Sequence, residues 1–151
     1  MLRSEIFSQE LKVLIEETFA KHHGMFTNRG TSMFETLDTI SAERASVLHG
    51  KDQETIAGHV FHLKFYIVVA QEYMRKTRTG HTDWDQSWVV KWVTEEEWKN
   101  LKNELQTEYQ SLMSFIDSVE DWNEEDYVSG MLGILAHNAF HLGAIRELNS
   151  M

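Results

Sequence analysis

The chain has 151 residues, a length typical of one domain, and its 42% hydrophobic and 11% aromatic content excludes a disordered chain. Its formal net charge of −10, with no basic block, argues against binding to nucleic acid or to an anionic membrane, because both need clustered lysine and arginine. The absence of cysteine excludes disulfides and thiolate ligands, so any metal ion must be held by histidine, carboxylate or water.

The absence of proline permits long uninterrupted helices, and apolar residues recur at helical spacing in four segments. We expect the first long helix at about residues 4–22. A connector rich in helix breakers follows, with a short helix at about residues 31–40 and another that begins near Ser41. The second long helix is expected from about residue 53 to residue 78.

A second connector, residues 79–93, carries three tryptophans. Thr94 and Glu97 form a capping box that predicts the start of a third helix, which extends to about residue 119. A fourth helix is expected over about residues 127–148. These elements predict an all-α protein, a four-helix bundle with short extra helices or turns between the first two long helices, in one domain over residues 1–151.

The amino-terminal residues lack the apolar segment of a signal peptide. The longest apolar stretch, residues 65–70, is much shorter than a membrane span. We therefore expect a cytoplasmic protein that does not associate with a membrane.

Two histidines on the fourth helix, His137 and His141, indicate a metal site. Residues four apart lie on one helical face, about 5–6 Å apart, so both imidazoles can bind one cation. A hydrogen-bonded pair of core histidines fits the same spacing. The second helix brings His59 and His62 toward the interior, and ligands from facing helices are a usual way to build a metal site in a bundle.

Three histidines leave one position of a tetrahedral site open, as catalytic zinc sites do. We expect the second nitrogen of each ligating ring to donate to a carbonyl, a carboxylate or water. Gly130, Gly133 and Gly143 are expected to allow close helix approach near the site.

Two motifs are similar to those of the DinB-like family of metalloenzymes, also called the DinB/YfiT-like four-helix bundles. Thr55-Ile56, followed six residues after the isoleucine by His62-Leu63, resembles the family's Ser-Ile-(x)5-His-Leu. The stretch from His137 to Ile145 resembles its His-(x)3-His-x-Gly-Gln-Ile, with Ala144 in place of the glutamine. The resemblance covers the whole chain in the order and spacing of its elements.

The resemblance implies that His62 is the third metal ligand, together with His137 and His141. Amphipathicity alone places His59 slightly nearer the centre of the buried arc, so the two interpretations disagree. We favour His62 and expect His59 to lie beside the ligands or in the pocket without binding the ion, where it can orient a substrate or shuttle a proton. If the family's glutamine bonds near the site, Ala144 removes that group.

The resemblance also implies a metal-dependent enzyme similar to thiol S-transferases, which acts on a small molecule and forms a homodimer. Zinc or nickel is the expected ion, although three imidazoles also suit copper or iron(II). The alternatives are a non-catalytic dimeric bundle with a structural ion and a bundle that binds no metal.

The remaining aromatic and histidine residues carry weaker expectations. The connector tryptophans can line a pocket for an apolar substrate or make ordinary core or subunit contacts. They are Trp84, Trp88 and Trp92. The histidines outside the two central helices are expected to be solvated. These are His22, His23, His49 and His81.

Overall fold

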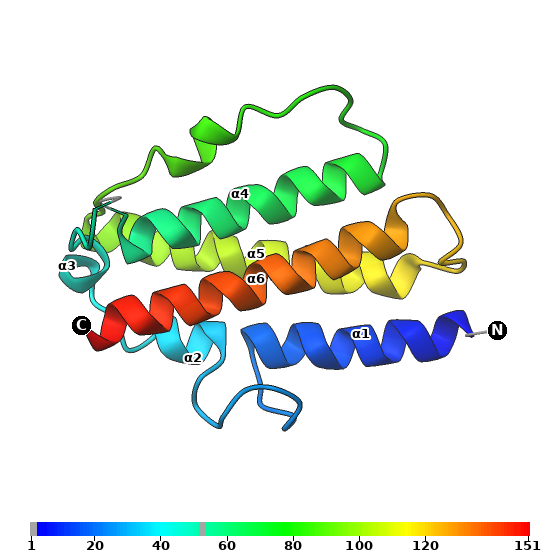
Figure 1. Ribbon diagram of the computed structural model, residues 1–151, viewed down its shortest axis with the longest axis horizontal. Helices are drawn as coiled ribbons and strands as arrows, with labels where there is room; N and C mark the ends of the chain where they lie inside the picture. Colours follow the sequence, from blue (N-terminus) through cyan, green and yellow to red (C-terminus); the bar gives the residue numbers. More distant parts are fainter. Residues whose placement is uncertain (1–2, 52–53) are drawn as a thin grey trace.

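The computed structural model describes residues 3–51 and 54–151 and is all-helical over these ranges, with no strand among them. The four long helices are α1 (Ser4–Phe19), α4 (Ile56–Met74), α5 (Glu95–Ser118) and α6 (Tyr127–Ser150) (Figure 1). Three short elements lie between them: α2 (Met33–Leu37), α3 (Ala42–Ala45) and the 3-10 helix η1 (Trp84–Trp88). The all-helical class expected from the sequence is confirmed.

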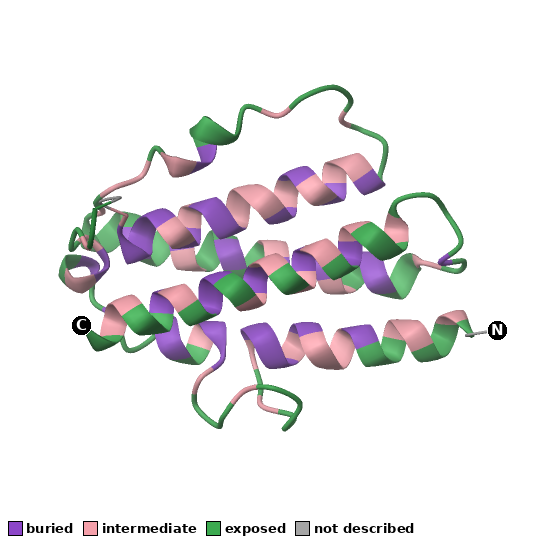
Figure 2. Cartoon of the chain, viewed as in Figure 1, coloured by how far each residue is buried: buried purple, intermediate pink, exposed green. Residues whose placement is uncertain are grey.

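The long helices pack so that α1 and α4 each contact both α5 and α6. Buried residues recur along all four long helices, whereas the connector between α4 and α5 is mostly exposed (Figure 2). The core is centred on large, fully buried side chains. They are Ile15, Phe19, Met33, Leu37, Ile56, Leu63, Ile67, Leu105, Leu112, Ile116, Met131 and Ile134.

The helix starts follow the capping residues of the sequence. At the start of α5, Thr94 Oγ1 accepts a hydrogen bond from the Glu97 N–H at 3.2 Å, and the Glu97 carboxylate accepts from the Thr94 N–H at 2.7 Å. At the start of α4, Thr55 Oγ1 accepts from the Gly58 N–H at 3.0 Å. Residue 53, where this helix was expected to begin, lies outside the described residues. The helix also ends four residues before residue 78, because Lys76 adopts a left-handed conformation with φ 59°.

The end of α1 is determined by a buried carboxylate. Glu17 is fully buried, and its oxygens accept hydrogen bonds from the backbone N–H groups of residues 23–27 and from the Thr27 hydroxyl, at 3.0–3.4 Å. Burial raises the pKa of this carboxyl, but the hydrogen bonds from Thr27, Phe26 and Met25 outweigh burial and lower the pKa to about 2. The chain therefore leaves the helix at Phe19, three residues before the expected end, and wraps around the carboxylate.

Two glycines allow close approach to α4. A Cβ at Gly58 would lie 2.9 Å from the Val90 carbonyl oxygen, so this glycine lets the connector lie directly against the first turn of α4. A Cβ at Gly130 would lie 2.8 Å from Met74 Sδ, so this glycine allows close packing of α6 on α4, but at the last residue of α4 and not near the histidines as expected. The expectation is wrong for Gly143, which is exposed and would meet no atom within 4 Å.

Among the described residues, α6 alone is long and apolar enough to cross a membrane by length and composition, with a mean hydropathy of 1.3 over 18 residues. The core helix of a soluble protein passes the same test, so this finding is weak support for a span. One third of that window, 33%, is buried. The exposed apolar side chains of α6 include Val128, Leu132 and Phe140.

Candidate metal centre

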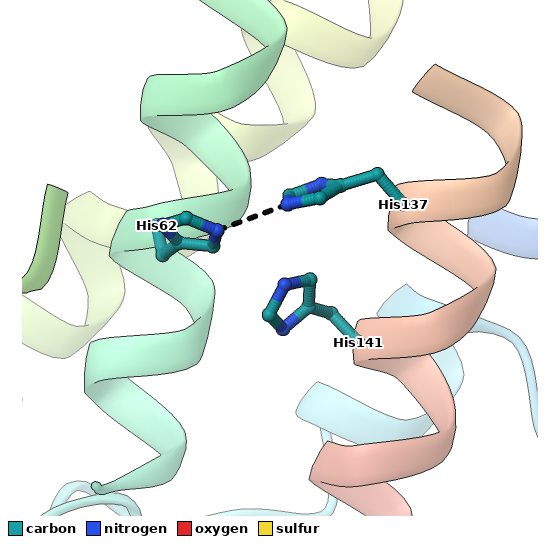
Figure 3. A group of neighbouring side chains, drawn as sticks. All are labelled: His62, His137 and His141. Atoms are coloured by element: carbon teal, nitrogen blue, oxygen red, sulfur yellow. Dashed lines mark hydrogen bonds between the residues drawn. The ribbon is translucent and has the colours of Figure 1, made fainter. Parts of the chain in front are cut away.

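Helices α4 and α6 together supply four histidines that face one another. His59 and His62 project from α4, and His137 and His141 project from successive turns of α6. Because α4 packs against α6, the rings of His62, His137 and His141 point toward a common centre (Figure 3). His62 and His141 are buried, and His137 is half-buried.

The geometry of these three rings suits one metal ion. One ring nitrogen from each lies within 4.8 Å of the other two, and His62 Nε2 is 2.9 Å from His137 Nε2. Zinc bonds of about 2.0–2.1 Å in a tetrahedral site put two ligand nitrogens about 3.3–3.4 Å apart. Binding of an ion therefore requires shifts of the rings: the His62 and His137 nitrogens must move apart, and any pair of nitrogens near the 4.8 Å limit must approach. The three histidines can hold a metal ion.

The fourth histidine, His59, lies beside this cluster and contacts one of its members. His59 Nδ1 is 2.9 Å from His141 Nδ1, and the two ring centroids are 5.1 Å apart. Because Nδ1 of His141 faces His59, its Nε2 is the nitrogen free to face His62 and His137. The grouping of His62 with the α6 pair follows the motif spacing and not the amphipathic pattern that favoured His59.

The second nitrogen of each ring in the cluster has a different environment. His62 Nδ1 lies 2.7 Å from the hydroxyl oxygen of Ser87, and His141 Nδ1 faces His59. His137 Nδ1 is buried without a hydrogen-bond partner in the described part of the chain. The expectation of carbonyl, carboxylate or water partners is therefore wrong for His62 and His141, since a hydroxyl and an imidazole take that place.

Aromatic side chains form the walls of the cluster. Trp88 stacks on His62 with centroids 4.1 Å apart, and Tyr66 stacks on His137 at 3.7 Å, each pair within 14° of parallel. Trp84 in turn packs against Tyr66 at 5.6 Å. Trp92 is 69% exposed and lines a separate hollow of about 290 Å³. Of the three connector tryptophans, Trp84 and Trp88 therefore lie at the histidine cluster, and Trp92 lies away from it.

Burial keeps the four histidines uncharged at neutral pH. Together with the neighbouring histidines, whose effect is smaller, burial lowers the pKa of His62 and of His137 to about 4 and that of His141 to about 3. Burial also lowers the pKa of His59, with the Glu54 carboxylate opposing this effect and Lys91 adding to it. Neutral imidazoles retain the lone pairs that a metal ion needs.

The histidines outside the cluster are only partly as expected. His23 and His81 are exposed, and His23 Nε2 lies 2.5 Å from the Glu16 carboxylate. His22 and His49 are half-buried, and each has one buried ring nitrogen without a hydrogen bond within residues 3–51 and 54–151, although His22 Nδ1 lies 3.5 Å from the Glu17 carboxylate. None of the four joins the cluster of three.

Ser87 is the site residue that sequence reasoning missed. It lies in a short 3-10 helix whose sequence, Trp-Asp-Gln-Ser-Trp, has no helical periodicity to indicate which side chain faces inward. The one available signal was Gly58, since a glycine in the first turn of an otherwise apolar helix indicates close approach by another segment.

Comparisons with protein-family models, with curated proteins and with solved structures find no match to this chain.

Proposed function

We propose that the chain is a DinB-like four-helix bundle that binds one divalent metal ion through Nε2 of His62, His137 and His141. The observation that carries this proposal is the convergence of three neutral imidazoles from two packed helices on one point. Zinc or nickel suits such an all-nitrogen ligand set. The two motifs on α4 and α6 support the family assignment, because they contain all three converging residues.

The resemblance further supports a metal-dependent enzyme, with transfer to or from a low-molecular-weight thiol as the reaction class. A divalent ion with an open position lowers the pKa of a bound thiol or water. The chain's own residues would hold the three nitrogens in place, and Trp88 and Tyr66 would keep bulk water from the His62 and His137 faces. His59 would orient His141 through the contact between their Nδ1 atoms. Ala144, at the position of the family's glutamine, argues for a substrate different from that of relatives with glutamine.

The second candidate is a non-catalytic bundle in which the ion joins α4 to α6. One observation favours it: His62 is only 8% and His141 only 5% exposed, so the described residues leave little of either ring open to a substrate. A substrate needs a route to the ion, whereas a structural ion needs none.

We also propose a homodimer. Its support is the exposed apolar surface of the connector, where Val89 is 60% and Trp92 is 69% exposed. Large exposed apolar side chains that gather in one region are typical of subunit contacts.

Metal analysis of protein purified without chelators tests the site. We expect one ion per chain and an anomalous-scattering peak between the three rings. Replacement of His62, His137 or His141 with alanine should abolish stoichiometric binding. His59→Ala should keep the ion, and His81→Ala, at an exposed position, is the matched control. Loss of the ion in His59→Ala and its retention in His62→Ala would mean that the wrong α4 histidine has been assigned.

Two measurements then separate the enzyme from the structural bundle. The first is metal-dependent conjugation of glutathione to 1-chloro-2,4-dinitrobenzene, followed spectrophotometrically with and without the ion. The second is a structure with the ion bound, which would show water or buffer at the fourth position in an enzyme and a fourth protein ligand in a structural site. An ion with four protein ligands would contradict the enzymatic proposal.

A further inference from the structure

The hydroxyl of Ser87 is a buried link between the connector and helix α4. Ser87 is fully buried, and its Oγ donates to the Trp84 carbonyl oxygen at 2.6 Å. The same oxygen lies 2.7 Å from His62 Nδ1. Both contacts are short, so the serine and the imidazole are held at hydrogen-bonding distance inside the protein.

The direction of the second hydrogen bond follows from the number of protons. A serine hydroxyl has a single proton, and a carbonyl oxygen can only accept. The Ser87 proton is therefore directed to Trp84, and the Ser87 oxygen must accept from His62. It follows that His62 carries its proton on Nδ1 and a lone pair on Nε2. This Nε2 is the nitrogen that faces His137.

The surrounding contacts keep the hydroxyl in register with the ring. Trp88, the residue after Ser87, stacks on the His62 ring and so fixes the plane of the imidazole. Farther along the connector, the Val90 carbonyl lies against Gly58, one turn before His62 on α4. Ser87 thus belongs to a segment that packs on α4 at two places, the His62 ring and Gly58.

We propose that Ser87 is a positioning residue that holds His62 in the Nδ1–H tautomer and thereby presents Nε2 to the metal ion. The part that concerns the ion rests on the proposed function. The part that concerns the tautomer does not, because the hydrogen bonds exist without an ion. A residue that sets the tautomer of a ligating histidine typically changes metal affinity about 10- to 100-fold when it is removed.

The first experiment reads the tautomer in metal-free protein. Long-range proton–nitrogen correlation spectra of chains with labelled histidine distinguish Nδ1–H from Nε2–H, and the His62→Ala spectrum identifies the signals of His62. We expect Nδ1–H for His62 in the original chain and loss of that preference in Ser87→Ala. An Nε2–H tautomer in the original chain, or an unchanged tautomer in Ser87→Ala, would overturn the proposal.

The second experiment measures zinc affinity by competition with a chromophoric chelator. Ser87→Ala should bind zinc about 10- to 100-fold more weakly than the original chain. The matched control is Ser111→Ala, which also removes a serine hydroxyl bonded to a side chain of α4, Gln71, at 3.1 Å. Equal losses in the two variants would show a general effect on helix packing and refute a specific role. If the original chain binds no zinc, the proposed function fails, and the tautomer spectra still decide whether Ser87 holds His62.

Discussion

The buried carboxylate of Glu17 gives the most direct test of how the loop after α1 is held. Glu17→Gln keeps the shape of the side chain but replaces one accepting oxygen with a donor that faces the N–H groups of residues 23–27. The fall of the pKa from 4.5 to about 2 corresponds to at most about 3 kcal/mol of stability at neutral pH. The covering loop is itself exposed, so screening by water reduces the expected loss to about 1–2 kcal/mol.

The sign of the pH dependence distinguishes this mechanism from simple loss of packing. A carboxylate with a lowered pKa stabilises the folded chain fully above pH 4.5, and this stabilisation is lost as the pH falls toward 2. Urea unfolding, followed by circular dichroism, should show Glu17→Gln less stable by about 1–2 kcal/mol at neutral pH, with the difference decreasing below about pH 4.5. The control is Glu16→Gln, which removes the neighbouring carboxylate, whose one hydrogen-bond partner among the described residues is His23. A difference that persists undiminished at about pH 3, or one below about 0.5 kcal/mol at neutral pH, would refute the reasoning.

Further predictions concern the histidines, the glycines and the subunits. The three clustered histidines have pKa values of about 3 to 4, below the ordinary 6.5, so their contribution to stability is complete above pH 6.5 and is lost as the pH falls toward 4. Bound zinc should be released over the same range, as measured by chelator competition, and release only above pH 6.5 would contradict this. Gly58→Ala should destabilise the chain by about 1–3 kcal/mol in thermal unfolding, because its Cβ would press on the Val90 carbonyl. Gly143→Ala, where the Cβ meets open space, should stabilise α6 by about 0.5–1 kcal/mol, and equal effects at the two glycines would show that close packing is not the cause. Light scattering should give twice the chain mass of 17.7 kDa, and a monomer at tens of micromolar protein would refute the proposed homodimer.

Features that depend on nearby residues were predictable from the sequence. The capping box of Thr94 and Glu97 marked the start of α5, because its hydrogen bonds connect residues three apart. Likewise, the four-residue spacing of His137 and His141 placed both rings on one face of α6. The motif spacing on α4 selected His62, which does join them.

Features that depend on distant segments were not predictable in the same way. His59 and His62 both project from α4 toward α6, and only the position of α6 decides which of the two rings joins His137 and His141. The early end of α1 depends on a loop that folds back onto Glu17. Ser87 reaches His62 across 25 residues of chain, from a segment with no periodic pattern. Such contacts arise from tertiary packing, which one sequence does not encode locally.

The separation of His62 and His137 along the chain makes any bound ion a ligand of the folded state. These residues are 75 positions apart, so in the unfolded chain an ion shared by both must close a long loop. The entropy of closing that loop costs about 4 kcal/mol, whereas His137 and His141 lie within one helical turn of each other. An ion would therefore bind the folded chain much more tightly than the unfolded one. Its presence should raise the unfolding temperature in proportion to the logarithm of its free concentration, and it should slow the separation of α4 from α6 most.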